Sequence, residues 1–460
     1  MEGYGFMKCI IRNYRGTAAA FLIAAMTLCA AAAARADAPR ARHIILFVGD
    51  GMHLQHEIAA SRYLFGTDNG LSFHAFPVQL HAATWDVNTY NEYARQMGAP
   101  EYSPDSFNPR IGYDPERGGA RPYPLAKVPD PSYFVTYDDD DTQRRNGRCP
   151  ATDSASAGTA LATGHKTETG NLAWLPGDAP GGELDSIAML MRARLGAAIG
   201  AVSTVPFTHA TPASFISHNI ARGNYFKGRA NDTSPGIAEE ILFQTKPEAV
   251  IGGGHPEWDN PGKTPNKGYM SWPLYEQMTH MNDYAFVERI AGRESEDALN
   301  KTAARAVIEG RRMLGLFGGK GGNFEPPVPA HSPGSPRVDR ATKENPLLAD
   351  AVTSAMEVLA RDPDGFFLIA EQGDIDWANH ANDYKWMIGS VWDLHNAVQA
   401  VVDFVDRPND SMDWSNTFVI VTADHSNSYM RLNPDKPLGP GELPEQDCSS
   451  GLCLYPHGSV

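Results

Sequence analysis

Cysteine is scarce in this sequence, which excludes a fold built on several disulfides. There are five cysteines in 460 residues, and Cys9 and Cys29 lie in an N-terminal stretch that we expect to be removed. Cys448 and Cys453 lie close together in a polar region, where an exported context favours a disulfide between them. Cys149 would then be unpaired, and three unrelated thiols are the alternative.

Long apolar runs and positive charge are also scarce. After the N-terminal stretch, no run is long enough to span a membrane, so we expect a soluble protein of one large or two ordinary domains. The formal net charge of −16 argues against nucleic acid or an anionic membrane as a partner. Much of this acidity is expected to serve solvation, and bound cations could balance the rest.

The N-terminal stretch resembles an export signal. Three basic residues precede an Ala-rich apolar run from 17 to 34, and Ala34-Arg35-Ala36 provides a small-x-small cleavage pattern. We therefore expect residues 1–36 to be a signal peptide and 37–460 to be an exported, periplasmic or extracellular protein. A membrane anchor is disfavoured because alanine is weakly apolar, and lipid attachment at Cys29 because the residues before it match a lipidation signal poorly.

Four apolar, β-branched runs each lead into polar residues of the kind that bind metals. The runs and the polar residues are 43–48 with Asp50, 198–202 with Thr208, His209 and Thr211, 366–369 with Glu371 and Asp376, and 417–421 with Asp424 and His425. Nearly continuous apolar strands indicate a parallel sheet covered on both faces. Because sites in such sheets form at the carboxyl ends of the strands, we expect these polar residues to share one site.

The fold class that we predict is α/β, with a largely parallel central sheet flanked by helices on both faces. Helical periodicity at 184–194, 297–314 and 386–405 supports the alternation of helices and strands. Two stretches interrupt it, near 86–148 and 223–340, and both contain Gly and Pro clusters. We expect them to be loop-rich insertions around the site entrance within one catalytic domain.

Ser154 lies where a helix is expected to start. The segment from 151 to 160 consists mainly of small residues that would begin a helix at or near this serine. Backbone N–H groups and the positive end of a helix suit an incoming phosphate. A serine hydroxyl is a poor nucleophile without activation, and the alternative is an ordinary helix cap by Asp or Ser.

Two pairs of residues are suited to zinc. Asp376 and His380 are four residues apart, so a helical turn would place both on one face. Asp424 and His425 are adjacent at a strand end, where a turn could aim both side chains inward. Nitrogen and carboxylate ligands together fit zinc.

Three further oxygen ligands are suited to magnesium. With waters, the side chains of Asp50, Thr211 and Glu371 form the hard oxygen set that magnesium prefers. Taken singly, each acid could instead cap a helix and each histidine could be an ordinary structural residue. Their combination favours a metal site.

Five motifs together resemble the alkaline phosphatase family, in the same order along the chain. They are Gly49-Asp-Gly-Met52, Thr152-Asp-Ser-Ala155, His209-Ala-Thr-Pro-Ala213, Glu371-x4-Asp376-x3-His380 and Thr422-Ala-Asp-His425. The resemblance implies hydrolysis of small phosphate monoesters to an alcohol and inorganic phosphate through a covalent phosphoserine. It also implies two zinc ions, one magnesium ion and a possible homodimer.

The resemblance assigns a role to each matching residue. Ser154 would be the nucleophile and Arg222 would clamp the phosphate, with Asp153 beside the nucleophile as an additional candidate. The implied metal ligands are Asp376 and His380 on the first zinc, Asp424 and His425 on the second, Asp50 between the second zinc and magnesium, and Thr211 and Glu371 on magnesium.

Several positions depart from the family's pattern. His209 replaces an aspartate of one well-known branch, and we expect it to act on magnesium through water. Trp377 replaces a lysine and is expected near the substrate, with core packing as the alternative. His53 replaces a glycine, for which we have no account. The family's further histidine on the first zinc is either His457 or lies in a missing C-terminal segment, and we expect truncation.

Two other functions compete with this interpretation. A phosphodiesterase or sulfatase could use a related metal-bearing sheet, but Arg222 and the complete magnesium set favour monoesters. A sulfatase would also need a Pro and an Arg after its nucleophile, which Ser154 lacks. A secreted metal- or phosphate-binding protein without catalysis is the alternative from another class.

Overall fold

The computed structural model describes most of the chain between residues 41 and 443. Inside this range it leaves out 81, 83, 97, 106–107, 109–133, 136–151, 230–232, 265–266, 409–410, 428–430 and 433–437. The predicted signal peptide, all five cysteines and His457 therefore lie outside the described residues. Within the described part, no helix combines the length and the apolar character needed to cross a bilayer.

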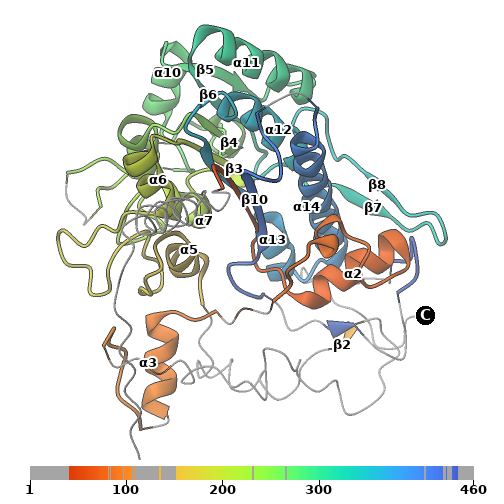
Figure 1. Cartoon of the computed structure of the whole chain (residues 1–460), viewed down its shortest axis with the longest axis horizontal. Helices are drawn as coiled ribbons and strands as arrows, with labels where there is room; N and C mark the ends of the chain where they lie inside the picture. Colours follow the sequence, from red (N-terminus) through yellow and green to blue (C-terminus); the bar gives the residue numbers. More distant parts are fainter. Residues whose placement is uncertain are drawn as a thin grey trace, which may run out of the picture. The chain divides into compact units, whose positions relative to one another are not determined.

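A seven-stranded sheet forms the centre of the unit that starts at Arg42, with strand order β10-β1-β9-β3-β4-β6-β5 (Figure 1). All its neighbouring strands run parallel, which confirms the predicted α/β class. Its strands are β1 His43–Gly49, β3 Ala198–Pro206, β4 Ala249–Gly253, β5 Tyr284–Glu288, β6 Arg312–Leu316, β9 Phe366–Gln372 and β10 Thr417–Thr422.

Helices cover both faces of this sheet. On one face lie α2 Leu54–Phe65, α11 Ser295–Glu309, α12 Leu348–Leu359 and α14 Tyr384–Val405. On the other lie α5 Ser154–Thr163, α6 Ile187–Leu195, α7 Ala210–Ile216, α8 Ile237–Glu240 and α10 Trp272–His280. The remaining elements are η1 Ser72–Ala75, α3 Val87–Gln96, β2 Phe134–Val135, η2 Ile241–Thr245, α9 Pro256–Asp259, β7 Val328–Ala330, β8 Arg337–Asp339, α13 Asp374–His380 and β11 Arg431–Leu432.

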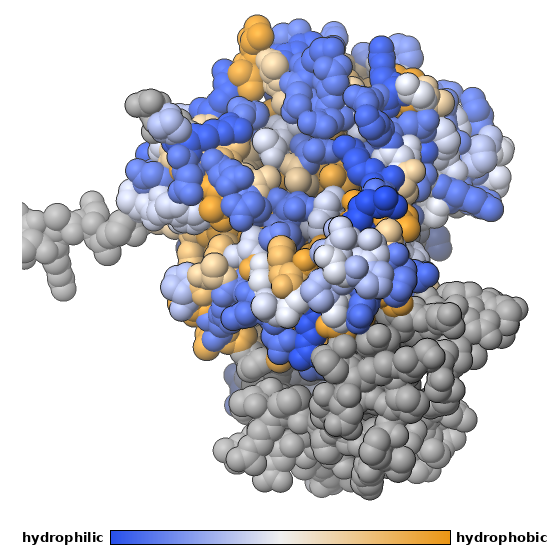
Figure 2. Space-filling model, turned by 90° about the vertical axis from the view of Figure 1, so that its right-hand side faces the viewer, coloured by the Kyte–Doolittle hydropathy of each residue, from blue (hydrophilic) through white to orange (hydrophobic). Residues whose placement is uncertain are grey.

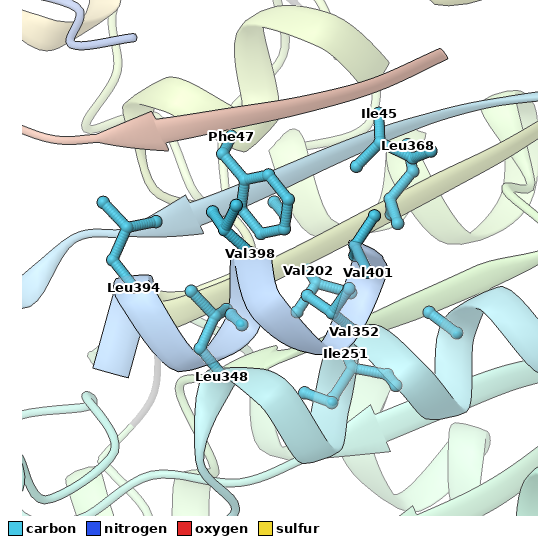
Figure 3. Packing of buried hydrophobic residues seen from close by; sticks show 14 of the residues in the cluster. Ile45, Phe47, Val202, Ile251, Leu348, Val352, Leu368, Leu394, Val398 and Val401 are labelled. Atoms are coloured by element: carbon cyan, nitrogen blue, oxygen red, sulfur yellow. The ribbon is translucent and has the colours of Figure 1, made fainter. Parts of the chain in front are cut away.

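The strand β1 shows why the strands are apolar at nearly every position. Ile45 and Phe47 pack in the core on one face, whereas Leu46 and Val48 pack on the other. Successive side chains of a strand point to opposite faces, so a strand with helices on both sides needs apolar residues throughout. Figure 3 shows the first of these cores, where side chains of α12 and α14 meet those of β1, β3, β4 and β9.

The segment from 223 to 340 corrects one prediction. It was expected to be a loop-rich insertion, but it contributes β4, β5 and β6 to the central sheet. The helix predicted over 297–314 ends at Glu309, where Gly310 takes a left-handed conformation with φ of 65°, and the chain continues as β6. These strands have only five residues each, and β4 and β6 contain glycine, which weakened their apolar signal.

Most of the other predicted insertion, 86–148, lies outside the described residues; its described part includes α3 and β2. Figure 2 shows one face of the molecule, on which hydrophilic residues dominate the coloured atoms and hydrophobic residues form small separate areas. Exposed apolar side chains of this kind are ordinary on folded proteins.

Candidate metal and phosphate site

A cleft of about 420 Å³ opens at the carboxyl edge of the sheet. It is lined by Thr152, Asp153, Ser154, His209, Arg222, Asp376, Trp377, His380, His425, Ser426 and Asn427. These residues come from the start of α5, the start of α7, the loop after α7, the helix α13 and the loop after β10. The strand ends therefore converge on one site, as the sequence predicted.

Ser154 is the first residue of α5, and its side chain is buried. Asp153 caps this helix by accepting a hydrogen bond from the Ser156 backbone N–H, so the Ser154 hydroxyl is not used as the cap. The Ser154 Oγ lies 3.1 Å from His425 Nε2 and 3.5 Å from Asp50 Oδ1. The hydroxyl therefore lies at a helix N-terminus and next to two predicted metal ligands.

Asp153 holds Arg222 in the cleft. Its Oδ1 accepts hydrogen bonds from the Ser156 N–H at 3.0 Å and the Gly170 N–H at 3.1 Å, and its Oδ2 lies 3.1 Å from Arg222 Nη1. Burial alone would raise the pKa of Asp153, but these hydrogen bonds and the guanidinium outweigh burial and lower it. Asp153 is therefore a carboxylate that orients the guanidinium.

His209 is neutral and has a defined proton position. Burial, and then the positive charge of Arg222, lower its pKa to about 3. Arg222 Nη2 lies 3.1 Å from His209 Nε2, and because a guanidinium only donates, Nε2 must accept. The proton is thus on Nδ1, which is buried without a hydrogen-bond partner among the described residues. In this tautomer Nδ1 carries the proton and can donate a hydrogen bond.

Buried carboxylates form the deepest part of the site. Ligand atoms of Asp50, Asp424 and His425 lie within 4.8 Å of one another, and so do those of Asp50, His209 and Glu371. Burial, and next the neighbouring Asp424, raise the pKa of Asp50 well above its ordinary value, and burial raises the pKa of Glu371 to about 7. Several acids in so dry a place need a cation if they are to be ionised together.

Unsatisfied oxygen atoms show that this set fits metal ions. Asp50 Oδ2, Asp424 Oδ2, Glu371 Oε1 and Thr211 Oγ1 are buried, and none has a hydrogen-bond partner among the described residues. Buried polar atoms are normally paired, so orphaned oxygens that face one another indicate ligands of an ion. The other Asp424 oxygen accepts hydrogen bonds from the Gly51 and His425 backbone N–H groups.

Asp376 and His380 lie together on α13, as their spacing predicts. Asp376 Oδ2 is 3.4 Å from His380 Nε2, and the His380 side chain is 71% exposed, at the open side of the cleft. In the described parts of the chain, no third His, Cys, Asp or Glu joins this pair. His457, the candidate for that place, lies outside the described residues.

The sequence interpretation missed two residues that hold the predicted ligands. Asn427 Nδ2 donates to Asp376 Oδ1 at 2.6 Å, and the Ser203 hydroxyl donates to Glu371. Asn427 follows His425 by two residues, so its place beside the last motif was the one available signal. Ser203 lies within β3, where nothing in the sequence distinguishes it from a core residue.

A side chain at Gly51 would clash with its neighbours, and we expect Gly51→Ala to weaken metal binding at the predicted zinc pair Asp376 and His380. Its φ is +66°, and an added Cβ would lie 2.8 Å from Asp376 Oδ1 and 2.9 Å from Asn427 Cβ. Displacing the group that orients a ligand weakens metal binding by about 10- to 100-fold. A zinc titration of the metal-free protein measures this change.

Gly292→Ala is the matched control for Gly51→Ala, because Gly292 has a φ of +71° and no atom within 4 Å of the added Cβ. Both variants carry the same backbone penalty of about 1 kcal/mol, but only Gly51→Ala should weaken zinc. Equal zinc affinity in the two variants would show that Gly51 does not position Asp376.

The fold and the site define a class of protein. The carboxyl edge of the parallel sheet gathers buried carboxylates, imidazoles, a serine at a helix N-terminus and an arginine, and this combination suits a protein that binds metal ions and phosphate. The chain belongs to the alkaline phosphatase family, whose model, described as "Alkaline phosphatase", matches residues 127–439. The resemblance inferred from the motifs is thereby confirmed.

Curated relatives agree with this assignment. The chain is 30% identical over 317 residues to alkaline phosphatase 3 of Bacillus subtilis, covering 67% of this chain and 57% of that protein. It is 29% identical over 299 residues to the alkaline phosphatase of Escherichia coli, covering 62% and 60%. Streptomycin-6-phosphate phosphatase of Streptomyces griseus is 30% identical over 314 residues, with 63% and 64% covered. The chain thus matches about three fifths of the length of these relatives.

Proposed function

We propose that the protein hydrolyses phosphate monoesters through a covalent phosphoserine on Ser154, and that it does so with two zinc ions and one magnesium ion. The observation that carries this proposal is the position of the Ser154 hydroxyl. It lies at a helix N-terminus, 3.1 Å from His425 Nε2 and 3.5 Å from Asp50 Oδ1, in the same cleft as Arg222. The family membership supports the same reaction.

The residues that would hold the metals fall into three sets. They are Asp376 with His380 for the first zinc, Asp424 with His425 for the second, and Thr211 with Glu371 for magnesium, with Asp50 shared between the second zinc and magnesium. When bound, such ions lower the pKa of the serine hydroxyl and of water, and they stabilise negative charge on the oxygens of the transferred phosphoryl group.

The chain's own groups position the ester. Arg222 can donate to two nonbridging phosphate oxygens at once, and Asp153 and His209 hold its guanidinium from two sides. The Ser154 oxygen then bonds to phosphorus as the ester P–O bond breaks, and the alcohol leaves with a proton. In the second step a water oxygen bonds to phosphorus as the bond between phosphorus and the Ser154 oxygen breaks, the Ser154 oxygen takes up the proton that the water gives up, and inorganic phosphate is released.

His209 serves this arrangement without binding a metal directly. Its neutral ring accepts from Arg222 through Nε2, and its Nδ1–H is free to donate to a water between it and the Asp50 and Glu371 carboxylates. This is the role through water that the sequence interpretation gave to His209 on magnesium.

Phosphate release from a simple aryl phosphate tests the proposal. At mildly alkaline pH, we expect release with zinc and magnesium, loss of release with a chelator, and recovery when the metals are restored. A bis-aryl phosphate is the comparison substrate, because a phosphodiesterase would prefer it. Faster turnover of the diester, or metal-loaded protein that binds phosphate but releases none from either ester, would overturn the proposal.

Arg222→Lys is expected to weaken phosphate binding. A lysine cannot donate in parallel to two oxygens, so kcat/KM should fall about 10- to 100-fold, with a matching rise in the inhibition constant of inorganic phosphate. Arg194→Lys, on the exposed side of α6, is the control and should leave both constants unchanged. Equal kinetic constants for the two variants would show that Arg222 does not bind the phosphate.

Export is part of the same proposal. Residues 1–36 would be cleaved as a signal peptide, and the mature protein would act in the periplasm or outside the cell. Sequencing the N-terminus of protein recovered from those compartments tests the cleavage. An intact N-terminus there would contradict it.

A further inference from the structure

Four aromatic rings form a continuous row that starts with Trp377 and His209 in the lining of the cleft and continues through Tyr269 to Tyr225. Trp377 of α13 meets His209 with ring centroids 5.8 Å apart, His209 meets Tyr269 at 6.4 Å, and Tyr269 meets Tyr225 at 5.1 Å. The angles between successive ring planes are 79°, 71° and 69°, so every contact is edge to face. Such pairs are favourable contacts between aromatic rings.

Glycines in the loops after β4 and β6 make room for this row. A Cβ on Gly322 would lie 2.7 Å from Tyr269 Cε2, and one on Gly254 would lie 3.1 Å from Tyr269 Cβ. Both glycines have positive φ, of +89° and +92°, which other residues rarely adopt. Gly321 of the same loop would place a Cβ 3.9 Å from Trp377 Cζ3. The two loops therefore pack closely against Tyr269, and the second also lies near Trp377.

Trp377 is the member of the row that offers a large apolar surface to the cleft. It is partly exposed and lines the same cleft as Ser154 and Arg222, and every other lining residue is polar or charged. Neither step of the proposed reaction uses the indole. A cleft of about 420 Å³ also has more room than a phosphate group needs, so part of it must receive the rest of the ester.

We propose that Trp377 forms a leaving-group subsite for planar aromatic groups, so that the preferred substrates are phosphate monoesters whose alcohol carries an aromatic ring. This inference rests on the proposed function of the Ser154 site. With the phosphate on Arg222 and Ser154, a ring in the leaving group can pack against the indole, whose orientation the contacts with His209 and the glycine loop fix. An aromatic pair contributes more than its buried area alone, whereas a saturated ring of similar size gains only burial.

Two esters with matched chemistry test the subsite. The leaving groups of 2-phenylethyl phosphate and 2-cyclohexylethyl phosphate are both primary alkoxides of similar size, so their ratio of kcat/KM reports recognition of the ring. The protein should prefer the phenyl ester, and Trp377→Leu should lower the ratio about 3- to 10-fold. Trp377→Phe should retain most of the preference, and Trp414→Leu, at an exposed position, should not change it.

Binding of the corresponding phosphonates separates failure of the subsite from failure of the proposed function. Calorimetry of metal-loaded protein with 2-phenylethylphosphonate and 2-cyclohexylethylphosphonate needs no turnover. Tighter binding of the phenyl compound that depends on Trp377 supports the subsite even if neither ester is hydrolysed. Equal binding of the two phosphonates overturns it. So does a Trp377→Leu variant in which both esters and inorganic phosphate are weakened alike, because Trp377 would then only position His209 and Arg222.

Discussion

Ser154→Ala is expected to abolish phosphate release from monoesters, with a fall in kcat of at least about 10⁴-fold. The covalent route needs the Ser154 oxygen. Thr152 and Ser426 are the other described residues with hydroxyls in the cleft lining, but of these three hydroxyls only that of Ser154 lies within 3.5 Å of both His425 and Asp50. Initial rates at saturating substrate measure the loss. Any residual rate would come from direct attack of water on the bound ester.

The same variant should remain folded, which keeps the result interpretable. Asp153 and not Ser154 caps α5, and alanine is favoured within a helix. We expect the free energy of unfolding to change by about 0.5 kcal/mol or less. Ser335→Ala, in an exposed turn, is the matched control for the substitution. A folded Ser154→Ala protein that keeps a tenth or more of the control's kcat would contradict the phosphoserine route.

Removing the metals is expected to make stability strongly dependent on pH. Burial raises the pKa of Glu371 and of Asp374 to about 7 and that of Asp393 to about 8, and burial raises that of Asp50 well above its ordinary value. In the unfolded chain these acids are ionised near pH 4, so between there and pH 8 the folded state binds more protons. The contribution of these acids to the free energy of unfolding is therefore fully present below their pKa in the unfolded chain, and it is lost as the pH rises through 7 and 8.

Denaturant titrations of metal-free protein at pH 6.5 and 8.5 measure this effect. We expect the free energy of unfolding to fall by on the order of 4 kcal/mol between them. The comparison starts at pH 6.5 because His209 and His56 have lowered pKa values in the folded protein. These histidines make the free energy of unfolding rise with pH, but only below the ordinary histidine pKa. A metal-free protein whose stability is constant or rises over this window would contradict the account.

Bound metals and a substitution of Asp393 separate the contributions of two groups of buried acids to this pH dependence. With zinc and magnesium bound, Asp50 and Glu371 should be held ionised, so the part of the fall that these two acids cause should disappear. Asp393 accepts hydrogen bonds from the Leu348 N–H and the Gln372 side chain. Its contribution to the pH dependence of the free energy of unfolding should remain when metals are present. Asp393→Asn should remove that contribution alone. If metals leave the whole pH dependence in place, the buried carboxylates near Asp50 are not the ligands.

The strand ends were predictable from sequence because two local patterns agreed there. The apolar runs of β1, β3, β9 and β10 are continuous, and each leads directly into residues of ligand type. The start of α5 at Ser154 and the pairing of Asp376 with His380 followed from helix-forming residues and from four-residue spacing. These predictions need only neighbouring residues, which is why they hold.

The features that the sequence did not reveal depend on contacts between distant segments. The strands β4, β5 and β6 are short, and their place in the sheet depends on pairing with partners far along the chain. The hydrogen bond from Asn427 to Asp376 joins positions 51 residues apart. The aromatic row from Trp377 to Tyr225 likewise forms only when the loops fold, so no periodicity in the sequence predicts it.

Trapping the covalent intermediate tests whether Ser154 carries the phosphoryl group. Metal-loaded protein is mixed with an aryl phosphate, quenched in acid within milliseconds, digested and analysed by mass spectrometry. We expect one phosphoryl group on the peptide that contains Ser154, formed before steady turnover and absent from Ser154→Ala. Phosphate release in solution with no phosphorylated peptide at any quench time, or a phosphoryl group on another residue, would contradict it.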